Sequence, residues 1–116
     1  MTNVTFFKRG GTYYGFQETG HSGYADAGQD IVCAALSAMT MLVINTIEIS
    51  FASDVEYTID EDTTDVTVTV PSVLDSSPDN ETKRFAVSGL IQGYFMQLMD
   101  MLEDYYDYLS VEEIEK

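Results

Sequence analysis

Alternating and aromatic positions at the start of the chain predict a β-hairpin. Residues 3–8 and 12–18 are rich in β-branched and aromatic side chains, which favour strands. The dipeptide Gly10-Gly11 between them accepts positive φ, as a tight turn requires. Residues 19–29 follow without a period of two or 3.6, so we expect a loop of about ten residues there. Loops of this length in a compact domain are more often functional than shorter connections are.

A change to helical spacing predicts a mostly buried helix from Asp30 to about Asn45. Asp30 directly precedes the apolar positions and is a suitable N-cap. The apolar positions expected on one face are Ile31, Ala35, Leu36, Met39, Leu42 and Val43. The stretch after Asn45 has no clear period.

The second half of the chain predicts another hairpin and a long helix. Residues 55–59 and 66–70 alternate apolar and polar side chains around an acidic turn at 60–62, so one face of this hairpin should be exposed to solvent. Ser76-Ser77-Pro78-Asp79 is typical of a helix start. An apolar stripe then continues for about thirty residues, at Val87, Leu90, Ile91, Tyr94, Leu98, Met101, Leu102, Tyr105 and Leu109.

These elements predict an α+β fold in a single domain, residues 1–116. The order ββαββα would form a two-layer sandwich, a small sheet with two helices packed on it. A length of 116 residues is enough for one core, and 45% hydrophobic content with 8 Tyr and 6 Phe excludes a disordered acidic tail.

Charge and cysteine content exclude several classes of function. Twenty acidic and five basic residues give a formal charge of −15, which repels phosphate backbones, so we expect no direct binding of nucleic acid. A single cysteine excludes an intramolecular disulfide and zinc sites built on cysteine pairs. The start of the chain has no signal-peptide pattern, and polar residues interrupt the apolar stretches, so we expect a cytoplasmic protein that does not associate with a membrane.

The one cysteine and the one histidine are the candidates for covalent catalysis, which needs a nucleophile and a base. His21 lies in the glycine-rich loop, and Cys33 lies in the first turn of the predicted helix. Free amides and the positive end of the helix dipole favour a thiolate there, and the same amides could stabilise an oxyanion. Asp30, one turn from the sulfur, opposes a second negative charge unless it caps the helix or His21 is protonated.

Simpler interpretations of the same residues stay open. A lone cysteine within an apolar run is often a small buried side chain, and a lone loop histidine is often a surface group. A metal site made of His21, Asp26 and Asp30 is conceivable, but no pair of these ligands has zinc spacing. We therefore predict neither a metal nor a cofactor.

The segment Gly20-His21-Ser22-Gly23-Tyr24-Ala25, followed by Gly28 and by Asp30-Ile31-Val32-Cys33-Ala34-Ala35, resembles the signature of the ribosomal-processing cysteine protease family called Prp. It joins a GH-x-x-YA loop to a DIVCAA helix start. The predicted order of elements also fits that family's small α+β fold over nearly the full chain.

The resemblance implies a cysteine endopeptidase with Cys33 as nucleophile and His21 as general base. Asp30 would be a supporting residue, and Gly20, Gly23, Tyr24 and Ala34 would support the site or bind substrate. The implied substrate is the N-terminal extension of a bacterial large-subunit ribosomal protein precursor, and the implied assembly is a homodimer. Ser22 and Leu36 depart from the family's familiar alanine and valine, and neither removes a reacting atom.

Two other functions remain as alternatives. The first is a non-enzymatic acidic binding module for a basic ribosomal protein, which would lose affinity with salt and would not need Cys33. The second is a redox sensor, although the chain has no resolving cysteine. The acidic residues around the second hairpin, Asp54, Glu56, Asp60, Glu61, Asp62 and Asp65, fit either a solvated face or attraction of a basic partner.

Overall fold

The computed structural model describes residues 1–20 and 27–116. Its strands are β1 (Thr2–Arg9), β2 (Thr12–Thr19), β3 (Glu56–Ile59), β4 (Val66–Thr69) and β5 (Leu109–Glu115), and its two long helices are α1 (Ala27–Asn45) and α2 (Glu81–Tyr105). A π-helical segment, Thr46–Ser50, continues α1, and 3-10 turns lie at Pro71–Leu74 and Pro78–Asn80.

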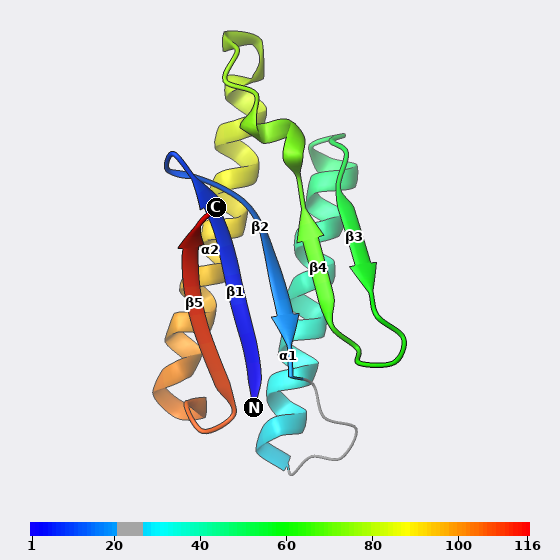
Figure 1. Cartoon of the computed structure of the whole chain (residues 1–116), viewed down its shortest axis with the longest axis vertical. Helices are drawn as coiled ribbons and strands as arrows, with labels where there is room; N and C mark the ends of the chain where they lie inside the picture. Colours follow the sequence, from blue (N-terminus) through cyan, green and yellow to red (C-terminus); the bar gives the residue numbers. More distant parts are fainter. Residues whose placement is uncertain (21–26) are drawn as a thin grey trace.

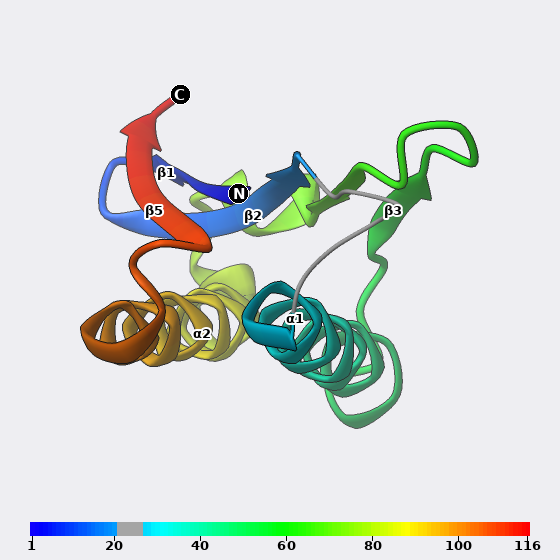
Figure 2. The same cartoon turned by 90° about the horizontal axis from the view of Figure 1, so that it is seen from below.

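The molecule has two layers, with a five-stranded sheet on one side and both long helices on the other (Figures 1 and 2). The strand order is β3-β4-β2-β1-β5, in which β5 runs parallel to β1 and the other pairs are antiparallel. The predicted α+β sandwich is confirmed. The predicted order ββαββα is incomplete, because a fifth strand follows the last helix.

The first hairpin is confirmed. Strands β1 and β2 pair antiparallel from Asn3–Thr19 to Arg9–Thr12. Gly10 and Gly11 have φ of +56° and +83°, a conformation that side chains with a Cβ rarely adopt. This explains the glycine pair at the turn.

Helix α1 begins three residues before its predicted start, at Ala27 rather than Asp30. Tertiary contacts account for the extra turn, because Gln29 is buried and Gly28 packs closely against the ring of Tyr108. Asp30 is thus an exposed residue of the first turn and not the N-cap.

The buried face of α1 also differs from the prediction. Ile31 and Leu42 were expected inside, but they are 51% and 60% exposed. The buried stripe is instead Gln29, Val32, Leu36, Thr40, Val43 and Ile44. It includes two polar residues, which a search for apolar spacing passes over.

The continuous helix of residues 27–50 is long and apolar enough to cross a membrane, and its most apolar stretch of 18 residues has a mean hydropathy of 1.8. The expectation that polar residues interrupt every such stretch is therefore wrong. Length and composition alone are weak support for a membrane span, because the core helix of a globular domain passes the same test. Here the buried stripe of the helix belongs to the core.

The second half of the chain matches the prediction up to the end of α2. Strands β3 and β4 form the predicted hairpin, and β3 is exposed along its whole length. Helix α2 follows the turn at Pro78 and runs through Gly89 and Gly93 to Tyr105. Leu109, predicted on the last helix, instead begins β5, whose pairing with β1 joins residues about 107 positions apart.

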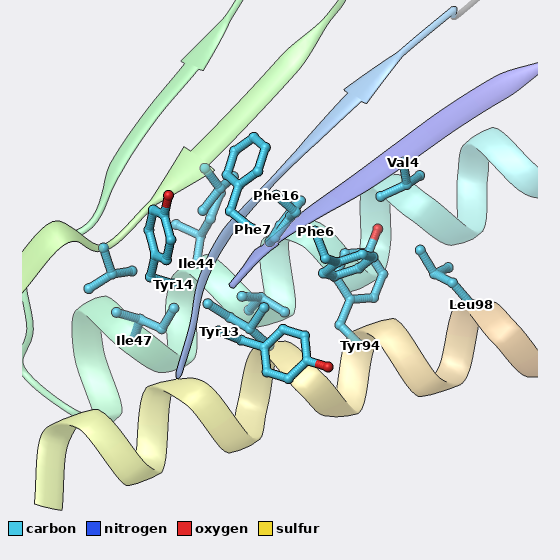
Figure 3. Close-up of a cluster of buried hydrophobic side chains, with 14 of the residues drawn as sticks. Val4, Phe6, Phe7, Tyr13, Tyr14, Phe16, Ile44, Ile47, Tyr94 and Leu98 are labelled. Carbon is cyan, nitrogen blue, oxygen red and sulfur yellow. The ribbon is translucent and has the colours of Figure 1, made fainter. Parts of the chain in front are cut away.

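The core lies between the sheet and the helices (Figure 3). Phe6 and Phe16 from the first hairpin meet Tyr94 of α2, with ring centroids 5.5 and 5.1 Å apart in edge-to-face geometry. This contact fixes α2 against the middle of the sheet.

Candidate active site

Cys33 lies on α1 with its side chain half-buried. The side-chain amide of Gln29, one turn earlier, donates from Nε2 to the Cys33 Sγ over 3.7 Å. The same amide donates to the Thr2 Oγ1 over 2.9 Å. Gln29 therefore joins the sulfur to the start of β1 and places a hydrogen-bond donor beside the thiol.

The earlier helix start changes the electrostatics expected at Cys33. As the seventh residue of α1, Cys33 lies in the second turn, where a regular helix pairs each amide with the carbonyl four residues before it. The amides without such partners belong to the first four residues, 27–30. The prediction of unpaired amides around Cys33 is therefore wrong.

Gly20 and Gly28 hold the two ends of the segment that carries His21. Gly20 has φ of +82°, and a Cβ there would lie 2.5 Å from the carbonyl oxygen of Met1. A Cβ on Gly28 would lie within 3 Å of three atoms of the Tyr108 ring. The positive φ and the nearby Met1 carbonyl favour glycine at residue 20, and a side chain at residue 28 would have to displace the Tyr108 ring.

The other site residues predicted from sequence divide into two groups. His21, Gly23, Tyr24 and Asp26 lie outside the described residues. Asp30 and Ala34 are exposed on α1, three residues before and one residue after Cys33. Asp30 is thus one turn from Cys33 on the helix surface, as the spacing predicted.

Glu18 is a buried acid that the sequence analysis did not single out. Its side chain is 2% exposed, and its Oε1 accepts hydrogen bonds from the Thr40 hydroxyl at 2.6 Å and the Tyr94 hydroxyl at 2.7 Å. Burial, together with the adjacent Glu18, raises the pKa of Tyr94, so its hydroxyl remains a donor. Strand alternation gave a signal, because Glu18 shares a strand face with Phe16 of the core.

A pocket of about 280 Å³ opens beside this carboxylate, between α1 and the hairpin of β3 and β4. Its walls are mainly apolar. The lining residues are Glu18, Ser37, Thr40, Met41, Ile44, Tyr57, Ile59, Thr64 and Val66.

Within residues 1–20 and 27–116, no group of three His, Cys, Asp or Glu side chains is arranged to hold a metal ion. The conceivable site of His21, Asp26 and Asp30 falls largely outside this part of the chain. The chemistry of the described residues is that of a thiol with an amide donor.

Comparison with known proteins agrees with that chemistry. A peptidase family model matches residues 1–110, and together with the thiol on α1 it assigns the protein to the cysteine proteases. The model is that of the cysteine protease Prp, so the chain belongs to the Prp family. The resemblance predicted from residues 20–35 is confirmed. No curated protein matches the sequence.

Solved structures share the fold over the full length of the chain. SMU.848 from Streptococcus mutans has 22% identity and a TM-score of 0.80, covering 100% of this chain and 99% of its own. The ribosomal processing protease Prp from S. aureus, solved with a substrate peptide, has 17% identity and a TM-score of 0.78 and covers 98% and 100%. The same S. aureus protein with a covalently linked product peptide has 19% identity, a TM-score of 0.74 and the same coverage.

Proposed function

We propose that this protein removes the N-terminal extension from a bacterial large-subunit ribosomal protein precursor. The family match over residues 1–110 is the observation that carries the proposal. The resemblance of residues 20–35 to the family signature implies that Cys33 is the nucleophile. The S. aureus relative is described as a ribosomal processing protease and has been solved with substrate and product peptides, which supports the same substrate class here.

In the proposed reaction, the Cys33 Sγ attacks the scissile carbonyl while His21 takes the thiol proton. The C–N bond then breaks, and His21 returns the proton to the leaving amine, which leaves an acyl-enzyme thioester on Cys33. Water, deprotonated by His21, hydrolyses the thioester and restores the thiol. Gln29, whose Nε2 lies 3.7 Å from the sulfur, is placed to donate a hydrogen bond to the thiolate or to the oxyanion that forms next to it.

Intact-mass spectrometry of the full-length precursor tests this proposal. The wild-type protein should cause one mass loss at a single N-terminal site, and Cys33→Ala and His21→Ala should cause none. Ser50→Ala, an exposed substitution at the far end of the same continuous helix, is the matched control and should cleave normally. Melting curves of all variants show whether any loss of cleavage reflects unfolding.

An unchanged precursor mass would overturn the protease function for this substrate. Complex formation that weakens with salt and ignores Cys33→Ala would then favour the acidic binding module. The net charge of −15 is the feature that supports this alternative.

We further propose that the protein acts in the cytoplasm as a homodimer, without binding nucleic acid. Large apolar side chains exposed on the two helices, including Ile31, Leu42, Phe85 and Met96, support an association of two copies. Sedimentation equilibrium should give twice the mass of 12.9 kDa, and Phe85→Glu should lower the association constant.

A further inference from the structure

The pocket beside Glu18 is aligned with Cys33 along α1. Ser37 and Met41, which line it, follow Cys33 by four and eight residues, so the three residues lie close to one face of the helix. At 1.5 Å per residue they are roughly 6 and 12 Å from Cys33 along the axis. An extended peptide advances about 3.3 Å per residue, so the pocket lies roughly two to four residues from a bond cleaved at Cys33.

The lining of the pocket combines apolar walls with one carboxylate. Met41, Ile44, Tyr57 and Ile59 supply aliphatic and aromatic surface, and the Tyr57 and Ile59 side chains are 47% and 58% exposed. Two hydroxyl donors hold the Glu18 carboxylate in place. Lysine and arginine have the complementary form, an apolar stem that ends in a cation.

The charge around the pocket favours the same kind of side chain. From Gly10 to Thr82 the chain contains no lysine or arginine, and this range includes every residue of the lining. The hairpin that forms one wall carries exposed acids at its turn. There the Asp60 carboxylate accepts the amides of Thr63 and Asp62, and these bonds lower its pKa, so it stays ionised.

We propose that this pocket is a specificity subsite that binds a lysine or arginine side chain of the peptide substrate, two to four residues from the cleaved bond. The stem of the basic side chain packs on the apolar walls, and its cation pairs with the Glu18 carboxylate. This inference rests on the proposed protease function and adds the residue that selects the substrate.

A peptide panel tests the subsite on the unmodified enzyme. Starting from a cleaved peptide, each position within four residues of the cleaved bond carries lysine, arginine, norleucine or glutamate in turn. At one position, kcat/KM with lysine should exceed that with norleucine by about tenfold or more, and glutamate should be the poorest. In the Glu18→Gln enzyme, the ratio of lysine to norleucine should fall to about one or two.

Glu112→Gln is the matched control, because this exposed acid lies on β5 at the opposite edge of the sheet. It should keep the preference for lysine. Equal cleavage of lysine and norleucine peptides at every position, or a preference that survives Glu18→Gln, would overturn the subsite and leave the protease function intact. If the wild-type enzyme cleaves neither the precursor nor any peptide, the protease function fails and the subsite fails with it. If Glu18→Gln does not fold, the peptide panel on the wild-type enzyme still tests whether any position prefers lysine to norleucine.

Discussion

At the scale of single residues, Gln29 joins the Cys33 sulfur to the scaffold. Its amide donates both to the Cys33 Sγ and to the Thr2 hydroxyl, and its side chain is 6% exposed. Thr2 is itself held through its amide, which donates to the carbonyl of Tyr108 over 2.9 Å. A donor fixed in this way needs no reorganisation when charge develops next to it.

We therefore expect Gln29→Leu to lower kcat/KM by about 100-fold, the loss typical of one missing donor to a developing oxyanion. Thr2→Val separates catalysis from structure, because it removes the other hydrogen bond of Gln29 and keeps the amide beside the sulfur. It should lower kcat/KM by clearly less than Gln29→Leu does, by about tenfold at most, because the donor stays beside the sulfur but is held less firmly. Steady-state kinetics of both variants check the prediction, and equal losses would mean that Gln29 acts only by holding the helix in place.

At the scale of elements, β5 is tied to the first hairpin by a polar cluster. The Tyr13 hydroxyl donates to the Glu113 carboxylate, and Lys8 pairs with Glu113 over 3.1 Å. Burial and the Glu113 bond raise the pKa of Tyr13 to about 12, and the Tyr13 and Lys8 bonds lower the pKa of Glu113. Between the two pKa values, a neutral phenol donates to an ionised carboxylate.

This arrangement predicts a pH-dependent stability difference between the wild type and Tyr13→Phe. A raised phenol pKa stabilises the fold below pH 10 and loses that effect as pH rises from 10 to about 12. The lowered pKa of Glu113 stabilises the fold above pH 4.5, and this stabilisation is lost as the pH falls below that value. The difference in melting temperature should therefore be largest between about pH 5 and 10. A difference that stays constant from pH 3 to 12 would contradict the role of this bond.

The start of α1 depends on the close fit of Gly28 against Tyr108. A methyl group at residue 28 would approach the ring to within 2.4–2.8 Å, so Gly28→Ala must displace the ring or the helix end. We expect a loss of roughly 1–3 kcal/mol in the free energy of unfolding, as for other overpacked sites. Tyr108→Ala in the Gly28→Ala background should recover much of that loss, which urea unfolding would measure. A double variant no more stable than Gly28→Ala would argue against the contact.

Local pattern was sufficient to predict the elements whose contacts are near in sequence. Both hairpins and most of both helices follow from alternation, helical spacing and turn residues. The extra turn at Ala27 and the strand β5 depend on partners about eighty and 107 positions away along the chain, Tyr108 for the first and β1 for the second, and a local pattern does not record such partners.

At the candidate site, the catalytic roles of Cys33 and His21 remain predictions. Sequence indicated Cys33 through its signature, but it missed Gln29 and Glu18, since a buried polar residue is recognised only when its partners are known. Ile31 and Leu42 show the opposite error. They were predicted to be buried because they are apolar, but an apolar residue on a helix need not face the core.

At the scale of the whole molecule, charge is distributed unevenly. All five basic residues lie in residues 8–9, 83–84 and 116, and twenty acidic residues lie along the chain. Lys8 and Arg9 are on β1 and Lys116 follows β5, so these three gather at the sheet edge opposite β3. The half of the molecule that holds α1, the pocket and the β3–β4 hairpin therefore presents acidic charge to an approaching substrate.

This field predicts that salt weakens cleavage of a basic peptide. The Debye length shortens from about 10 Å at 0.1 M to about 3 Å at 1 M, so long-range attraction is screened over that range. We expect kcat/KM for a lysine-rich peptide to fall by about tenfold between 50 and 500 mM NaCl. Most of this change should appear in KM, because the field concentrates substrate and does not act on the bond that breaks. A peptide with glutamine at every basic position outside the pocket subsite is the control, and its kcat/KM should change by less than about twofold. If both peptides lost activity equally, salt would be acting on the enzyme itself, and its acidity would then serve to keep the surface solvated.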